Sequence, residues 1–219
     1  MLNLEAVRTA GKRRAVFFDR DGVLTELVHN PATGEHESPH ALADVRLCSG
    51  AVESLGQLQA AAFDLFIVSN QPSYAKGKVG IDTIKAIADM VEAQFMESGV
   101  HFRETFYCYH HADGIVPGYS GVCACRKPSP HFLLQAEERY GIDLRRSWMV
   151  GDRDSDIECG QRAGCRTILI NHPRSQKHQG MSEPDYVSRD VTTAVAVIVE
   201  QANPRPAELS GTGSRGEGG

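Results

Sequence analysis

Short apolar runs alternate with longer amphipathic stretches along most of the chain. Five runs are typical of buried strands: Ala15–Phe18, Leu65–Val68, Thr105–Tyr109, Trp148–Val150 and Thr167–Ile170. Five further segments have apolar residues at helical spacing: Ala51–Ala61, Ile81–Ser98, Pro130–Tyr140, Ser155–Ala163 and Val191–Gln201. This alternation predicts an α/β fold in which a parallel sheet has helices on both faces.

Three segments do not fit this pattern. Thr25–Ala43 holds three His, two Pro and one Gly, so it reads as a loop or short hairpin over the strand ends. His110–Val122 is a second irregular insertion. From Asn203 the chain is polar and Gly-rich, which predicts a disordered tail (203–219) after a single domain (1–202).

Composition narrows the class of partner. The 219 residues carry a formal net charge of -5, which argues against nucleic acid or an acidic membrane as the main partner. No apolar stretch approaches the roughly 20 residues that a membrane helix needs, and Met1–Arg14 has no apolar signal core. We therefore expect a cytoplasmic protein, a monomer, with a small-molecule substrate.

The chemistry begins at Asp19-Arg20-Asp21-Gly22, directly behind the first predicted strand. Open α/β sheets bind ligands at the carboxyl ends of their strands. Two clustered carboxylates repel each other, so the pair implies a bound cation or a shared proton. An acidic turn that ends the strand is the simpler alternative, and this segment alone leaves both open.

Three more polar segments fall at predicted strand ends or helix starts. Ser69-Asn70-Gln71 offers a hydroxyl and backbone N–H groups for an oxyanion, or is a plain turn. Arg126-Lys127-Pro128 precedes a helix, where cations and the helix N-terminus attract phosphate, or is a solvated basic pair. Asp152 precedes another helix and is a better metal candidate than Asp154 or Asp156, which can also act as caps.

The cysteines form a second cluster. Cys108, His110, Cys123 and Cys125 supply three sulfurs and one imidazole, a complete tetrahedral set for a structural Zn²⁺. His111 could replace His110, although the Cys-x-His spacing favours His110. Reduced cysteines in a loop are the alternative. A zinc ion here would clamp the loop that carries Arg126 and Lys127.

Taken together, these segments resemble the four motifs of the haloacid dehalogenase (HAD) superfamily of phosphotransferases. The resemblance implies that Asp19 is the nucleophile and Asp21 the general acid and base. It implies that Mg²⁺ bridges the carboxylates of Asp19 and Asp152 and the backbone carbonyl of Asp21. It also implies that Ser69 and Lys127 bind the transferring phosphoryl oxygens. Asp156 is expected to orient Lys127 or a metal-bound water.

Within the superfamily, the chain resembles the heptose bisphosphate phosphatases and the related histidinol-phosphate phosphatases. The shared features are a short loop in place of a cap domain, Ser69-Asn70-Gln71, and the Cys-x-His and Cys-x-Cys-Arg-Lys-Pro elements. The expected substrate is a heptose 1,7-bisphosphate, cleaved at the 7-phosphate during nucleotide-activated heptose (lipopolysaccharide) synthesis; histidinol phosphate is the alternative. The segment 69–77 departs from the usual form at Pro72, Tyr74 and Lys76, which leaves fine specificity open.

Several polar residues are candidates for binding the substrate. These are Arg20, Asn70, Arg126, Lys127 and Arg153, with Lys76 and Lys78 as further cations. A zinc-knuckle nucleic-acid binder would need a basic surface and stacking aromatic residues, which the acidic balance disfavours. A catalytically inactive scaffold is disfavoured because every motif residue is present.

Overall fold

Six parallel strands form the centre of the computed structural model, which describes residues 11–31 and 33–202. Their order across the sheet is β5-β4-β1-β6-β7-β8. The strands are β1 (Arg14–Phe18), β4 (Phe63–Asn70), β5 (Glu104–Cys108), β6 (Trp148–Gly151), β7 (Arg166–Ile170) and β8 (Tyr186–Ser188). The helices are α2 (Ala51–Ala60), α3 (Ile81–Glu97), α4 (His131–Tyr140), α5 (Asp154–Ala163) and α6 (Val191–Ala202).

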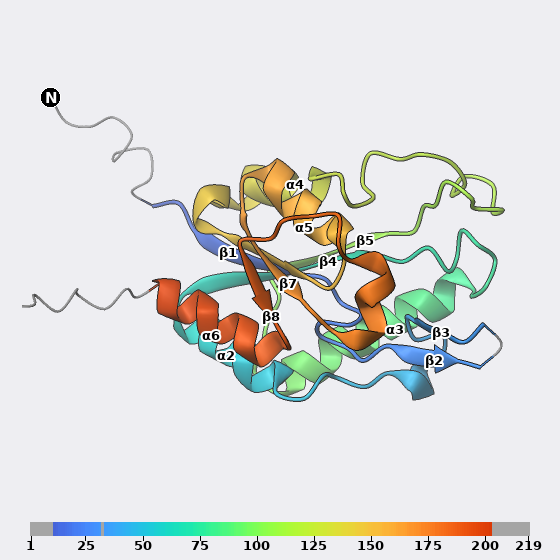
Figure 1. The fold of residues 1–219 in the computed structure, drawn as a ribbon, viewed down its shortest axis with the longest axis horizontal. Helices are drawn as coiled ribbons and strands as arrows, with labels where there is room; N and C mark the ends of the chain where they lie inside the picture. The colour runs from blue at the N-terminus through green and yellow to red at the C-terminus, as the bar shows by residue number, and fades with distance from the viewer. Residues whose placement is uncertain (1–10, 32, 203–219) are drawn as a thin grey trace, which may run out of the picture.

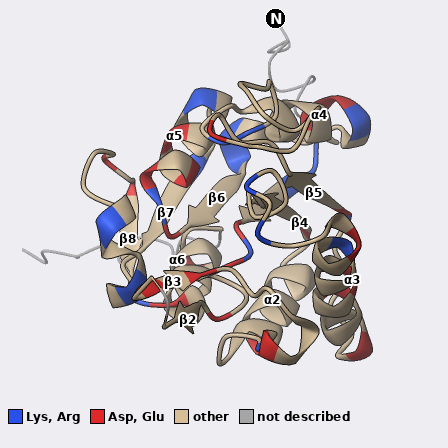
Figure 2. Ribbon diagram, turned by 90° about the vertical axis from the view of Figure 1, so that its right-hand side faces the viewer, with Lys and Arg blue, Asp and Glu red and all other residues tan. Residues whose placement is uncertain are grey.

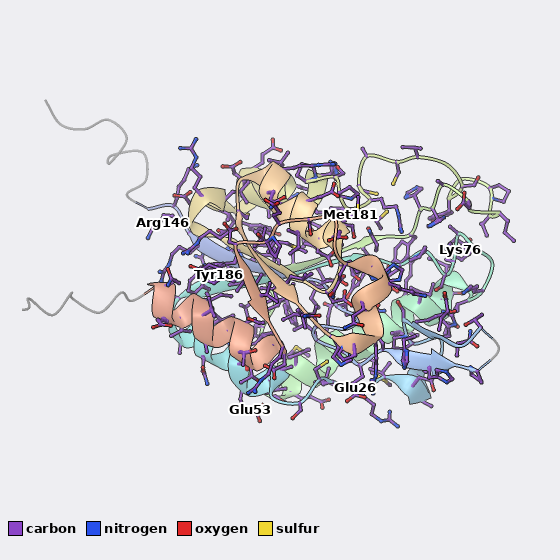
Figure 3. The ribbon with its side chains drawn as sticks, viewed as in Figure 1. Glu26, Glu53, Lys76, Arg146, Met181 and Tyr186 are labelled. Atoms are coloured by element: carbon purple, nitrogen blue, oxygen red, sulfur yellow. The ribbon has the colours of Figure 1, made fainter. Side chains whose placement is uncertain are left out.

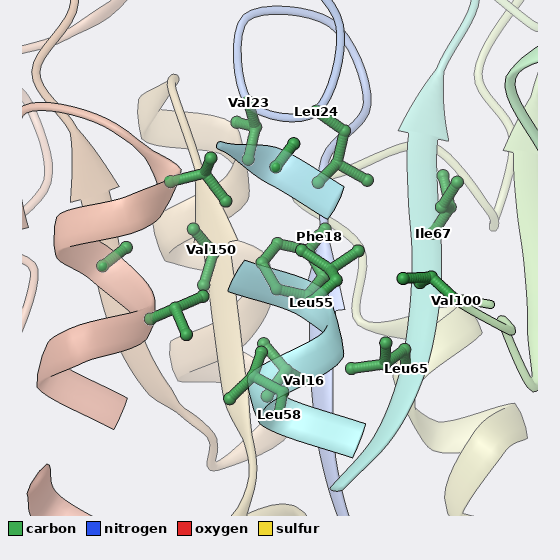
Figure 4. Close-up of a cluster of buried hydrophobic side chains, with 14 of the residues drawn as sticks. Val16, Phe18, Val23, Leu24, Leu55, Leu58, Leu65, Ile67, Val100 and Val150 are labelled. Carbon is green, nitrogen blue, oxygen red and sulfur yellow. The ribbon is translucent and has the colours of Figure 1, made fainter. Parts of the chain in front are cut away.

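The alternation of side chains along β1 divides the core into two layers. Val16 and Phe18 point to the face covered by α2, α3 and α6, where they pack against Leu55 and Leu58 of α2 (Figure 4). Ala15 and Phe17 point to the opposite face, where α4 and α5 cover the sheet (Figure 1). Because both faces are covered, β1 is apolar and buried after its first residue, from Ala15 to Phe18.

The predicted strands and helices are confirmed within one or two residues at most ends. The strand predicted over Thr105–Tyr109 is Glu104–Cys108, and the central run predicted over Leu65–Val68 extends to Phe63–Asn70. The sequence did not predict β8, a three-residue strand that pairs with β7 at the edge. The predicted tail after Asn203 lies outside the described residues.

Two insertions stand at the carboxyl ends of the strands (Figure 1). The first is a hairpin of β2 (Val28–Asn30) and β3 (Glu35–Glu37), which confirms the alternative of a short hairpin. The second is the irregular loop between β5 and α4. Across residues 11–31 and 33–202, neither insertion forms a separate cap domain, and no helix is long and apolar enough to cross a membrane.

Candidate active site

Parallel strands bring the predicted acidic residues to one edge of the sheet. β1 lies between β4 and β6, and Phe18 is paired with Val150, so Asp19 and Asp152 follow neighbouring strands. The N–H of Asp19 donates to the carbonyl of Val150 at 2.9 Å. Carboxylate oxygens of Asp19, Asp152 and Asp156 all lie within 4.8 Å of one another. Figure 2 faces this edge and shows acidic and basic segments in the loops around it.

Lys127 neutralises part of this acidic cluster. Its Nζ lies 2.8 Å from Oδ1 of Asp19, 2.8 Å from Oδ1 of Asp156 and 2.5 Å from the carbonyl oxygen of Val68. Burial lowers the pKa of the Lys127 ammonium, but the charges of Asp156 and Asp19 outweigh it and raise that pKa above its usual value. Lys127 is therefore a fixed cation beside Asp19, as expected for a group that meets phosphoryl oxygens.

The structure brings Asp156 to Lys127, where the sequence placed it as an orienting residue. Its other oxygen, Oδ2, accepts a hydrogen bond from the N–H of Arg153 at 3.0 Å, at the start of α5. Gly151 is required here, because a Cβ at that position would overlap the side chain of Asp156. Asp156 thus has both a helix-capping contact and an ion pair with Lys127.

The cluster fits a divalent cation. Asp152 is fully buried, and among the described residues its Oδ1 has no hydrogen-bond partner. Oδ2 accepts a hydrogen bond from Ser175, and Gly22, at φ +87°, leaves no room for a Cβ beside it. Burial, together with the charges of Asp19 and Asp156, raises the pKa of Asp152 to about 7. Such carboxylate oxygens suit Mg²⁺, so Asp19 and Asp152 could hold this ion.

Asp21 is also buried, but its surroundings lower the pKa of its carboxyl group, whereas those of Asp152 raise it. Burial alone raises the pKa of Asp21, yet the charge of Arg20 and hydrogen bonds from Arg20, Gln71 and Ser38 lower it to about 2. Arg20 donates from Nε and Nη2, each at 2.9 Å, and Gln71 donates from Nε2 at 2.6 Å. Asp21 is therefore held as a carboxylate at the wall of the pocket.

Two predicted substrate-binding residues have different surroundings from those expected. Arg20 was a candidate for binding the substrate; in the structure its side chain is 1% exposed, is paired with Asp21 and is not among the residues that line the pocket. Asn70 does line the pocket, but its amide binds the backbone of Lys127, with Oδ1 accepting and Nδ2 donating at 3.1 Å each. Ser69 is buried at the end of β4, where its Oγ accepts from Gln71 at 3.1 Å.

The four predicted zinc ligands converge next to this site. The three sulfur–sulfur distances among Cys108, Cys123 and Cys125 are 3.3 to 3.6 Å, and Nδ1 of His110 lies 3.7 and 3.9 Å from two of the sulfurs. A tetrahedron with Zn–S bonds of about 2.3 Å has edges of similar length. His111 is not in the cluster; its Nδ1 accepts from the N–H of Asp113.

The loop of this cluster also positions Arg126, which donates to the carbonyl oxygen of His110 at 3.1 Å. The cluster could therefore hold a metal ion that fixes the Arg126-Lys127 segment.

A pocket of about 290 Å³ opens above the carboxylates, at the small end of the range for ligand sites. Its cations are those predicted from the sequence, Lys76, Lys78, Arg126, Lys127 and Arg153, and one that was missed, Lys177; His178 also lines the pocket. Lys76 lies at this end of the molecule, far from Arg146 at the other end of the strands (Figure 3). The pocket wall thus has an excess of groups that attract anions.

The β2–β3 hairpin contributes acidic residues that the sequence did not identify. Glu37 binds Lys78 at 2.9 Å, and Glu35 binds Lys177 at 2.5 Å. These ion pairs join the hairpin to two other segments of the pocket wall. Neither ion pair involves Arg126 or Arg153, which also line the pocket, and Nε of Arg153 lies 3.8 Å from Oδ1 of Asp152.

Comparisons with known proteins agree with this geometry. A HAD-hydrolase-like family model matches residues 124–194. The D-glycero-alpha-D-manno-heptose-1,7-bisphosphate 7-phosphatase of Photorhabdus laumondii is 34% identical over 168 residues, covering 75% of this chain and 87% of that protein. The D-glycero-beta-D-manno-heptose-1,7-bisphosphate 7-phosphatase of Pasteurella multocida is 31% identical, covering 85% of this chain and 97% of that protein.

A solved structure gives the same result. The D,D-heptose 1,7-bisphosphate phosphatase of B. bronchiseptica, complexed with magnesium and phosphate, superposes with a TM-score of 0.71 at 25% identity. The match covers 86% of this chain and 99% of that one. The chain therefore belongs to the HAD-like hydrolases, in the family of the D-glycero-D-manno-heptose-1,7-bisphosphate 7-phosphatases.

Proposed function

We propose that this chain is a Mg²⁺-dependent phosphatase that removes the 7-phosphate of D-glycero-D-manno-heptose 1,7-bisphosphate. The observation that carries the proposal is the Asp19–Lys127 pair, 2.8 Å apart, beside Asp152, whose buried Oδ1 accepts no hydrogen bond from the described residues. In one pocket, Asp19 is then the nucleophile, Lys127 the cation for the phosphoryl group, and Asp19 and Asp152 the ligands for a metal ion. The relatives named for this activity match most of the chain.

In the first half of the reaction, the Asp19 carboxylate attacks phosphorus and the bond to the sugar oxygen breaks, leaving an aspartyl phosphate. Lys127 lies against Asp19 and offsets the negative charge that gathers on the phosphoryl oxygens. Asp156 and the Val68 carbonyl hold the Lys127 ammonium in position. When bound, Mg²⁺ reduces the repulsion between the anionic nucleophile and the anionic substrate.

Asp21 is the acid and base in this proposal. As an acid it gives a proton to the sugar oxygen as the P–O bond breaks. As a base it takes a proton from the water that hydrolyses the aspartyl phosphate, which restores the protonated Asp21 for the next cycle. The charge of Arg20 lowers the pKa of Asp21, whereas the negative charge of a bound phosphate raises it and favours the protonated form.

Zinc is the second metal of the proposal. Cys108, His110, Cys123 and Cys125 would bind Zn²⁺ with no open coordination position, so the ion is structural. Its function is to hold the 108–125 segment, and with it Arg126 and Lys127, at the pocket. In the same proposal the enzyme is a cytoplasmic monomer of nucleotide-activated heptose synthesis.

The bisphosphate is favoured over histidinol phosphate because the pocket has cations beyond those needed for one phosphate. Arg126 and Arg153 line the pocket, together with Lys76, outside the Asp19–Lys127 pair. Each well-placed charged hydrogen bond to a second phosphate contributes about 1.5–3 kcal/mol. A single such contact changes kcat/KM by about tenfold or more.

The test measures kcat/KM for three substrates in one buffer at one Mg²⁺ concentration. These are the heptose 1,7-bisphosphate, the corresponding 7-monophosphate and histidinol phosphate. We expect the bisphosphate to exceed both others by at least about tenfold. If histidinol phosphate is the best substrate, the alternative function is right and the argument from the second phosphate fails.

A further inference from the structure

The Asp21 carboxylate has more hydrogen-bond donors than a catalytic acid needs. Oδ1 accepts from Arg20 Nε and from Thr25 Oγ1, each at 2.9 Å. Oδ2 accepts from Arg20 Nη2 at 2.9 Å and from Gln71 Nε2 at 2.6 Å. A carboxylate has about four lone-pair sites. Together with the hydrogen bond from Ser38, these donors therefore fix both the plane and the direction of the Asp21 side chain.

Arg20 contacts the reaction site directly through Asp21. The guanidinium is 1% exposed and is not part of the pocket wall, and its salt bridge within residues 11–31 and 33–202 is to Asp21. In the same part of the chain, its Nη1 has no hydrogen-bond partner. Burying a charge with one donor unsatisfied is unfavourable. The buried Arg20 guanidinium donates two parallel hydrogen bonds to Asp21. Two such bonds fix the orientation of the Asp21 carboxylate, which a single point charge does not.

The other two donors connect Asp21 to different parts of the site. The Thr25 hydroxyl lies after the turn at Gly22 and contacts the Arg20 carbonyl oxygen as well as Asp21. The Gln71 amide follows β4 and reaches both Asp21 and the Oγ of Ser69, the latter at 3.1 Å. Asp21 is thus held relative to the ends of both β1 and β4.

We propose that Arg20, Thr25 and Gln71 are positioning residues that together hold the Asp21 carboxyl group for proton transfer to the leaving sugar oxygen. The inference rests on the acid role of Asp21 in the proposed function. When Asp21 carries its proton, one donor has to release the carboxyl group. Gln71 keeps a partner in Ser69 when it does so, whereas Arg20 and Thr25 retain the direction of the group.

The test uses two leaving groups. A sugar phosphate releases an alkoxide that needs a proton, whereas p-nitrophenyl phosphate releases a stable phenolate that does not. The kcat/KM ratio reports steps up to the first P–O cleavage. For Arg20→Met we expect a loss of at least about 100-fold with the sugar phosphate, and a loss at least tenfold smaller with p-nitrophenyl phosphate. Gln71→Met and Thr25→Val should give the same selectivity with smaller losses.

Arg20→Lys separates position from charge, because it keeps the positive charge and loses the two-pronged geometry. We expect kcat/KM of Arg20→Lys with the sugar phosphate to lie between the values for wild type and Arg20→Met. Its loss with p-nitrophenyl phosphate should again be smaller. If Arg20→Lys equals wild type, charge alone is sufficient and the positioning role is refuted. If Arg20→Met does not fold, as judged by circular dichroism, then Arg20→Lys, Gln71→Met and Thr25→Val decide the question by the same comparison.

Asp21→Asn separates this inference from the function it rests on. If Asp21→Asn lowers kcat/KM by the same factor for the sugar phosphate and for p-nitrophenyl phosphate, the acid role of Asp21 in the proposed function is wrong. The positioning inference is then wrong as well. A second outcome is that Asp21→Asn lowers kcat/KM mainly for the sugar phosphate, whereas the folded Arg20, Thr25 and Gln71 variants lower it equally for both substrates or not at all. In that case the positioning inference alone is overturned.

Discussion

Lys127 and Asp156 form a buried ion pair whose energetic coupling follows from the structure. Nζ has two carboxylate partners at 2.8 Å, Asp19 and Asp156, and all three side chains are less than 10% exposed. Lys127→Met leaves both carboxylates without their cation, which costs about 3–5 kcal/mol of unfolding free energy. Asp156→Asn leaves Lys127 with Asp19 and the Val68 carbonyl oxygen, so its cost is smaller, about 1–3 kcal/mol.

The double variant removes the cation together with one of its two anions. We expect it to be more stable than the sum of the single losses predicts, by about 1–3 kcal/mol. The assay is urea unfolding followed by circular dichroism at pH 7 in buffer without Mg²⁺, with the slope on urea compared among variants. The exposed pair Arg162–Glu158, 2.7 Å apart on α5, is the matched control, and its coupling should stay within about 0.5 kcal/mol. If the losses of unfolding free energy for Lys127→Met and Asp156→Asn simply add in the double variant, the two side chains are not coupled in the folded protein.

Two further predictions concern parts of the molecule outside this pair. Cys123→Ser should lower bound zinc from about one ion per chain to none. It should also lower the melting temperature by roughly 6–12 °C, because closing the 108–125 segment stabilises the fold by about 3 kcal/mol. Cys48→Ala, outside the cluster, is the control, and zinc retained by Cys123→Ser would contradict the ligand set. Asp190 accepts from the N–H of Thr193 at 2.7 Å at the start of α6, so Asp190→Ala should cost about 1 kcal/mol at pH 7. Burial raises the pKa of Asp190, but Thr193 and Arg189 outweigh it and lower that pKa, so the cap contributes fully above the usual carboxyl pKa and is lost in acid. In urea unfolding, the difference from wild type should narrow below about pH 4, and a constant difference would contradict this assignment.

The sequence predicted the acidic cluster because parallel strands leave little freedom at their carboxyl ends. Once Ala15–Phe18 and Trp148–Val150 are strands of one sheet, Asp19 and Asp152 follow at the same edge. The helix after Pro130 similarly brings Lys127 to this edge. The position of each residue depends on short segments whose apolar pattern is clear.

The role of Arg20 could not be predicted in the same way. A charged residue between two acidic ones at a strand end reads as a candidate for binding the substrate, and its burial depends on Thr25, Gln71 and the shape of the turn. Arg20 lies beyond the end of β1, so the alternation of strand side chains does not predict where its side chain points.

The ion pairs of the hairpin lacked any such signal. Glu35 and Lys177 are far apart in the sequence, and their segments have no regular spacing. β8 was missed because its three residues are too few to display an alternating pattern.

The proposed phosphatase depends on Asp19 as its nucleophile, and Asp19→Asn is the substitution that probes this role. The substitution removes the attacking charge with little change in volume. The measurement is steady-state phosphate release from the heptose 1,7-bisphosphate with Mg²⁺, using protein whose fold and zinc content match wild type. We predict a fall in kcat of at least about 1,000-fold. Phosphate release near the wild-type rate from the purified variant would show that Asp19 is not the nucleophile.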